Sequence, residues 1–175
     1  YFEGPFEVTQ RALGAADVSA VDIDGDGDLD ALAALRSGMR LVWYENVDGE
    51  LTNIAHRIDE GTRFNPVRAA DLDGAGLLDL MATTITDQIM RQYRGLGAGQ
   101  FSAPIVVDTF ATSSGLDFEF GDADSDGDLD LFAIRNPEAI LVLYINDGMG
   151  NLGPRITIDG DVPGVLDIEL ADLDD

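Results

Sequence analysis

The sequence predicts an all-β fold, a β-propeller built from four-stranded antiparallel blades. A loop rich in aspartate and glycine recurs at offsets of 49, 51 and 50 residues, and the segments around it are short and apolar. Glycine or proline interrupts these segments about every ten residues, which disfavours a helical solenoid. A β-sandwich would not repeat so regularly, so we expect about three and a half blades of a seven- or eight-bladed ring.

The repeat units span residues 2–50, 51–100 and 101–151, and a half unit covers 152–175. Tyr44, Tyr93 and Tyr144 each lie 22 residues after the first aspartate of their loop. These tyrosines and Trp43 could form an exposed carbohydrate platform by stacking on sugars. Recurrence at one place in every unit is what packing between blades requires, so we expect them in the core.

Each complete unit is expected to supply four strands in a fixed order around its loop. The expected first strands are 18–22, 67–71, 116–122 and 166–172, the second strands 31–35, 80–84 and 131–134, and the third strands 41–46, 89–94 and 140–146. A glycine-rich turn then leads to a fourth, outer strand, which opens at Leu51, Phe101 or Leu152. Apolar and acidic residues alternate in 116–120 and 166–170, so one face of these first strands should be buried.

The loop of the first unit, residues 22–30, places carboxylates on alternate residues and a glycine where the chain must turn sharply. Asp22, Asp24 and Asp26 hold loop positions 1, 3 and 5. Asp28 offers its backbone carbonyl from position 7, and Asp30 closes the site from position 9. Hard oxygen ligands in this order suit Ca²⁺, so we predict a calcium site here.

The same loop returns in the later units with different degrees of completeness. The third unit repeats all five acidic positions, as Asp122, Asp124, Asp126, Asp128 and Asp130. The second unit keeps Asp71, Asp73 and Asp79 but has Ala75 at position 5 and Leu77 at position 7. The fourth loop begins at Asp172 and Asp174, where the sequence stops. We therefore predict two strong calcium loops, one weakened loop and one truncated loop.

Two other interpretations of these loops compete with calcium binding. Acidic turns rich in aspartate and glycine occur in many proteins without a metal. Five aspartates in nine residues repel one another strongly, which favours a bound cation. An EF-hand shares the spacing but needs a glutamate at position 12 and flanking helices. Position 12 is Ala33, Ala82 or Ala133, and the flanking segments are predicted strands.

Composition narrows the classes of partner. The formal net charge is −24, but 16 of the 34 acidic residues lie in the four loops, which leaves 18 acids against 10 basic residues. This balance and the lack of an arginine cluster disfavour nucleic acid as a partner. There is no cysteine, so disulfides are excluded, and no apolar run is long enough for a membrane span.

The loops, the Trp43-Tyr-Glu-Asn46 strand and the Gly97-Ala-Gly-Gln-Phe101 turn together resemble the FG-GAP or VCBS repeats. These repeats build the integrin-alpha type of propeller. The resemblance implies that each calcium loop joins the first and second strands of its blade on one rim. It also implies an extracellular or cell-surface module for adhesion or recognition, because most members have that role.

Three classes of function remain open. The first is a non-catalytic, calcium-stabilised module that binds a protein or glycan. The second is an enzyme scaffold, for example for polysaccharide cleavage, although no serine, cysteine or second histidine forms a motif with the single histidine, His56. The third is a structural subunit. Three and a half blades cannot close a ring, so we expect the natural chain to continue, or copies to associate into a ring or filament.

Overall fold

The computed structural model describes residues 12, 14–110, 116–135, 138–165 and 167–171. The first sheet contains β1 (Ala15–Val21), β2 (Asp30–Leu35), β3 (Arg40–Val47) and β4 (Glu50–Glu60). The second contains β5 (Phe64–Ala70), β6 (Asp79–Thr84), β7 (Ile89–Tyr93) and β10 (Ile105–Thr109). The third contains β11 (Leu116–Gly121), β12 (Asp130–Arg135), β13 (Ile140–Tyr144) and β14 (Ile156–Asp159). A short ribbon joins β8 (Gly95–Gly97) to β9 (Gln100–Phe101). Within the described ranges, no helix is long and apolar enough to cross a membrane.

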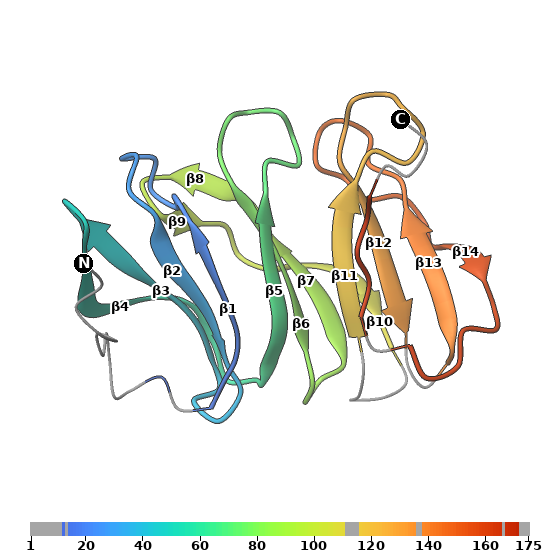
Figure 1. The fold of residues 1–175 in the computed structure, drawn as a ribbon, viewed down its shortest axis with the longest axis horizontal. Helices are drawn as coiled ribbons and strands as arrows, with labels where there is room; N and C mark the ends of the chain where they lie inside the picture. The colour runs from blue at the N-terminus through green and yellow to red at the C-terminus, as the bar shows by residue number, and fades with distance from the viewer. Residues whose placement is uncertain (1–11, 13, 111–115, 136–137, 166, 172–175) are drawn as a thin grey trace.

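The three sheets lie side by side, each with its first strand innermost (Figure 1). Every pairing within a sheet is antiparallel, and the middle inner strand, β5, contacts both β1 and β11. The loops between the first and second strands all lie along one edge, at the top of Figure 1. This architecture confirms the predicted β-propeller with four-stranded antiparallel blades, and the described blades form an open array.

Each sheet takes its outer strand from the repeat unit that follows. β4, β10 and β14 pair with the third strands of the preceding units. Only β4 starts near the expected position, because Phe101 lies in the β8–β9 ribbon and Leu152 forms an isolated bridge with Asn146. Consequently β10 and β14 begin several residues later than predicted.

The strand predicted at 166–172 is absent from the described residues of that segment, 167–171. In the three complete sheets, the first strand pairs with a second strand across the loop. The described chain offers 167–171 no such partner. The segment nevertheless lies beside β11, where the Ile168 amide donates to Asp117 over 3.3 Å.

The core lies between the sheets because the second strands are apolar on both faces. On β2, Leu32 and Ala34 pack toward the second sheet, while Ala33 and Leu35 belong to a cluster on the opposite face. Alternate side chains of a strand point to opposite faces, so a strand buried on both sides is apolar almost throughout. A separate cluster around Phe118 fills the space between the second and third sheets.

The recurring tyrosines are buried, which confirms their predicted place in the core; Tyr44, Tyr93 and Tyr144 are at most 4% exposed. The Tyr93 hydroxyl donates to Asp59, and the Tyr144 hydroxyl donates to Asp108, both over 2.6 Å. Each aspartate stands on the outer strand of the preceding sheet, so these bonds join adjacent blades. Burial raises the pKa of both phenols well above the usual value, and the neighbouring carboxylates raise it further.

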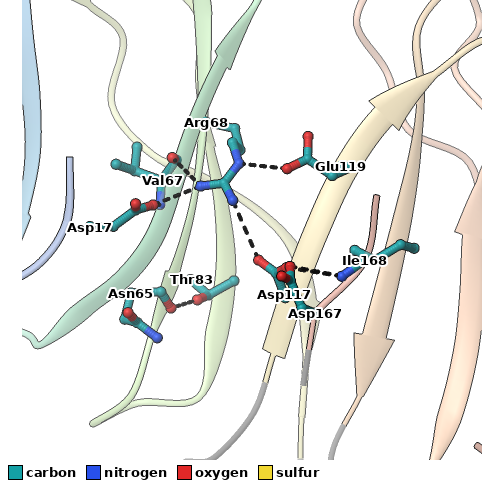
Figure 2. A network of polar contacts seen from close by, with 9 residues as sticks. All are labelled: Asp17, Asn65, Val67, Arg68, Thr83, Asp117, Glu119, Asp167 and Ile168. Carbon is teal, nitrogen blue, oxygen red and sulfur yellow. Dashed lines mark hydrogen bonds and ion pairs between the residues drawn. The ribbon is translucent and has the colours of Figure 1, made fainter. Parts of the chain in front are cut away.

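The inner strands are connected by an arginine in the middle sheet (Figure 2). The Arg68 guanidinium lies 2.7 Å from Asp17 of β1 and 2.9 Å from Glu119 of β11, and it also reaches Asp117 at 3.6 Å. Asp17 accepts the Val67 amide as well, over 2.9 Å. One side chain of β5 therefore pairs with carboxylates of both neighbouring blades.

Candidate metal centre

The first candidate site is the loop between β1 and β2. Ligand oxygens of Asp22, Asp24 and Asp30 all lie within 4.8 Å of one another. Asp22 accepts the amides of Gly25 and Gly27, over 2.8 and 3.0 Å, which folds the loop back on its first residue. Gly27 has a φ of 99°, a backbone conformation that is strained for any residue with a Cβ atom, so position 6 favours glycine.

Asp30 anchors this loop from its buried end. One carboxylate oxygen accepts the Ile23 amide over 2.9 Å, and the other accepts the Asn46 amide over 2.8 Å. Asp30 is 1% exposed, so these amide bonds partly compensate for the burial of its charge. Asp30 therefore connects the start of the loop to the end of β3.

The loop between β11 and β12 repeats this geometry. Asp122, Asp124 and Asp130 form a second cluster whose ligand oxygens lie within 4.8 Å of one another. Asp130 is completely buried and accepts the amides of Ala123 and Asn146, each over 2.8 Å. Two loops separated by 100 residues of sequence thus present the same three-carboxylate arrangement.

The second loop, between β5 and β6, is built differently. Asp71 accepts the Gly76 amide and Asp79 accepts the Gly95 amide, over 2.8 and 2.7 Å. Asp71 Oδ1 and Asp79 Oδ2 are buried without a hydrogen-bond partner. With Asp73, these carboxylates do not reach the mutual proximity found in the other two loops. The second loop therefore keeps two buried carboxylate oxygens that receive no hydrogen bond from the described residues.

The electrostatics of the loops fit a hard cation. None of the ion pairs in the described part of the chain involves a loop aspartate. Desolvation raises the pKa of Asp24, and the nearby carboxylates of Asp26 and Asp30 raise it further. Desolvation likewise raises the pKa of Asp79, with added repulsion from Asp73. Clustered carboxylate oxygens in a loop that turns sharply at a glycine are the kind of donor set that Ca²⁺ takes in proteins.

The predicted ligands do not all converge. Asp26 and Asp126 lie outside the two clusters and instead accept the amides of Asp28 and Asp128, each over 2.9 Å. The position 5 carboxylates thus stabilise the turns here, and their role as ligands stays a prediction, as does that of the position 7 carbonyls. The two fourth-loop candidates, Asp172 and Asp174, lie outside the described residues.

Sequence reasoning missed the asparagines that support the loops. The Asn46 side chain donates to the Leu29 carbonyl over 3.0 Å, and Asn146 donates to the Leu129 carbonyl over 3.1 Å. Each asparagine stands 24 residues after the first aspartate of its loop, so the repeat spacing contained the signal. Gly95 takes the corresponding place in the second unit.

A small cavity lies between the first sheet and the β8–β9 ribbon. His56 stacks on Trp43 with ring centroids 4.3 Å apart, and its Nε2 lies 3.3 Å from a Glu45 carboxylate oxygen. Gly99 covers Trp43 so closely that an added Cβ would fall 2.2 Å from the indole ring. The cavity measures about 160 Å³ and is also lined by Gln100. His56 thus helps to pack Trp43 and also borders a polar recess.

Comparison with known proteins supports the repeat and the fold described above. The FG-GAP-like repeat matches residues 22–82 and again 71–133. No curated protein matches the sequence. A solved structure on recognition of non-reducing terminal N-acetylglucosamine by an Agrocybe aegerita lectin is similar, with a TM-score of 0.59 and 22% identity. The likeness covers 83% of this chain and 38% of the lectin chain, so this chain spans well under half of the lectin's length. At this identity the likeness concerns the fold.

Proposed function

The chain belongs to the FG-GAP-like repeat family, and on that premise we propose that it is a non-catalytic, calcium-stabilised binding module. The observation that carries the proposal is the pair of three-carboxylate clusters on one edge of the propeller. Asp22, Asp24 and Asp30 would hold one ion, and the equivalent residues of the third unit would hold another. Bound calcium would compensate the mutual repulsion of these carboxylates.

We propose an extracellular or cell-surface location for this module. Extracellular modules bind calcium with dissociation constants of about 10⁻⁴ to 10⁻³ M, so sites of that strength are filled outside cells. The first and third clusters each keep one aspartate in the interior and two nearer to solvent. Such sites would stay loaded outside the cell and would act as structural elements.

A glycan is the ligand class that we propose for the binding surface. The structural neighbour is a lectin, and the cavity beside His56 offers an aromatic wall next to polar groups. At about 160 Å³, it is smaller than most ligand pockets and would admit a single sugar residue or a similar group. His56, Arg57 and Gln100 would supply hydrogen bonds at its rim.

We further propose that more blades cover the outer face of the third sheet. Asp59 and Asp108 on the outer strands of the first two sheets accept tyrosine hydroxyls of the next sheet, whereas in the described part of the chain no sheet follows the third. Further blades would come from the same protein or from other copies. Light scattering tests this idea, since a monomer of the 175-residue chain that melts cooperatively and does not associate would contradict it.

A calcium titration followed by a glycan-binding screen tests the main proposal. Calorimetry should show at least two sites, and Asp24→Asn and Asp124→Asn should each remove one. Asp161→Asn, which changes an exposed aspartate outside the loops, should leave the stoichiometry intact. Glycan binding should weaken when a chelator is present. A chain that binds no calcium, or a glycan signal that ignores the chelator, would contradict the proposal.

A further inference from the structure

Asn146 occupies a place between two of the loops. It is 2% exposed, and its backbone amide donates to Asp130 over 2.8 Å. Its side-chain amide donates to Leu129 O over 3.1 Å and to Leu72 O over 2.7 Å. Leu129 belongs to the third loop and Leu72 to the second. One buried side chain therefore bonds the backbones of two neighbouring loops.

The corresponding residues of the other units do not make this pair of hydrogen bonds to two loops. Asn46 donates to Leu29 of its own loop, and its side-chain oxygen is buried without a partner. Gly95 has no side chain, and a Cβ there would fall 2.5 Å from the Leu78 carbonyl oxygen. Within the described ranges, no hydrogen bond joins the first loop to the second. Among the three described loops, hydrogen bonds thus connect the second to the third but do not connect the first to the second.

The turn that follows Asn146 adds hydrogen bonds to the third strand of the second sheet and to the residue after it. The Gln92 side chain donates to the Gly150 carbonyl over 2.9 Å, and Arg94 donates to Asn151 over 2.7 Å. A Cβ on Gly150 would lie 3.3 Å from Asp73 Cβ and 3.6 Å from Asp79 Oδ2, so this turn packs closely against the second loop. The third blade is therefore seated directly on the second candidate site.

We propose that Asn146 is a positioning residue that couples the third loop to the second. The proposal rests on calcium binding by the third loop. When that loop closes, Asp130 and Leu129 are fixed, and Asn146 is fixed with them. The Asn146 side chain then donates to Leu72 O and so orders the second loop. This loop begins at Asp71, whose buried Oδ1 has no hydrogen-bond partner. The first loop closes independently, because no such bond reaches the second loop from it.

Hydrogen exchange on the full 175-residue chain, measured by mass spectrometry with calcium and with chelator, tests this coupling. Amides of residues 71–79 should exchange at least about fivefold faster in Asp124→Asn than in the unaltered chain, both in calcium, a ratio typical of coupled sites. Asp24→Asn, which disables the first loop, should leave exchange in 71–79 unchanged.

A matched pair of glycine variants isolates the side chain. Asn146→Gly and Asn46→Gly both copy Gly95 and both lose a bond to their own loop, but only Asn146→Gly loses the bond to Leu72. We expect calcium-dependent protection of 71–79 to fall by at least about fivefold in Asn146→Gly and to persist unchanged in Asn46→Gly. Equal protection in both variants would overturn the coupling.

Calorimetry on the same samples separates the two proposals. If Asn146→Gly still binds calcium at the third loop while 71–79 loses its protection, the coupling is supported. If the unaltered chain binds calcium and 71–79 does not respond to Asp124→Asn, the coupling is wrong and the proposed function stands. If the unaltered chain binds no calcium, the proposed function fails, and the coupling fails with it.

Discussion

The middle sheet differs from its two neighbours at repeated positions while sharing their strand order. It carries Ala75 in the loop, Gly95 after the third strand and Arg68 on the inner strand. At the same positions the flanking sheets carry Asp26 and Asp126, Asn46 and Asn146, and Ser19 and Glu119. The middle sheet thus has fewer carboxylates in its loop, and its Arg68 supplies the positive charge that pairs with the inner strands of both neighbouring sheets. Repeat units with the same strand order can therefore carry different charges and have different electrostatic roles.

Calcium removal should have the largest effect and should act on the flanking sheets. A site held at 100 times its dissociation constant contributes about 2.7 kcal/mol, so two such loops contribute about 5 kcal/mol. For a chain of this size, the melting temperature should fall by about 10 °C or more in excess chelator. Scanning calorimetry with and without chelator measures the shift. A change within a degree or two would contradict a structural role for the ion.

Loss of the central cation should come next. Arg68→Met keeps the apolar length of the side chain but leaves Asp17, Asp117 and Glu119 without their cation. Since the Arg68 side chain is only 28% exposed, we expect a loss of about 2 kcal/mol in the free energy of unfolding. Urea denaturation measures it. Arg57→Met, which breaks an exposed ion pair with Glu60, is the control and should cost less than about 0.5 kcal/mol.

Removal of the buried aspartate at loop position 9 should destabilise the protein more in the third loop than in the second. In chelator, Asp130→Ala leaves two amides without acceptors, whereas Asp79→Ala leaves one and also removes a buried, unpaired oxygen. Each orphaned group costs about 1 kcal/mol or more, so Asp130→Ala should be the more destabilising variant by at least about 1 kcal/mol. Chemical denaturation checks the ranking, and equal losses would show that the two loops are supported alike.

Restoration of the missing carboxylate should make the second loop resemble its neighbours. Ala75 is exposed, so Ala75→Asp can add a side chain without a clash. We expect calcium affinity at this loop to rise by about tenfold, since the number of charged ligands tunes affinity. Leu77→Asp is the control, because position 7 is expected to contribute its backbone carbonyl only. A calorimetric titration with no gain in affinity or stoichiometry would contradict the assignment of position 5.

The smallest effect concerns a titrating group that the middle sheet lacks. Burial raises the pKa of Asp117, and a hydrogen bond with Asp167 raises it further, whereas Pro66 occupies the equivalent position. Protonation of Asp117 therefore favours the folded state. Its contribution is fully present below the ordinary value of 3.8 and is lost as the pH rises through the raised folded-state value.

Asp117→Asn should flatten the dependence of stability on pH above 3.8 and should raise the free energy of unfolding at pH 7. The Asp117 side chain is 14% exposed, so screening by solvent is limited. Thermal melts between pH 3.5 and 7 measure the effect, with Asp161→Asn as an exposed control. A slope equal to that of the unaltered chain would rule out this account of Asp117.

Periodicity predicted what repeats in this chain. The offsets of the loop aspartates and of Tyr44, Tyr93 and Tyr144 were enough to place the blades and the buried phenols. Asp59 and Asp108, the partners of two of these phenols, are 49 residues apart whereas Tyr93 and Tyr144 are 51 apart, so the repeat spacing did not indicate this pairing. Regularity in the sequence thus corresponds to the burial that Tyr44, Tyr93 and Tyr144 share.

Features that occur once were beyond sequence reasoning. Arg68 stands where its equivalents are Ser19 and Glu119, and its partners come from two other sheets, so no spacing announces its role. Asn146 looked like the end of a strand, since its bond to Leu72 exists only after two blades pack. The convergence of positions 1, 3 and 9, without position 5, depends likewise on the backbone path of the loop.

The borrowed outer strand has a consequence for how such arrays change over generations. Each unit gives its leading strand to the previous sheet and receives one from the next. A duplication or deletion of one whole unit of about 50 residues therefore changes the number of sheets by one and leaves every remaining sheet with four strands. The contacts of Tyr93 with Asp59 and of Tyr144 with Asp108 would be kept, because both residues of each pair belong to the same unit and move with it. Gain or loss of whole units in the gene can thus change the number of blades while every sheet keeps its full set of paired strands.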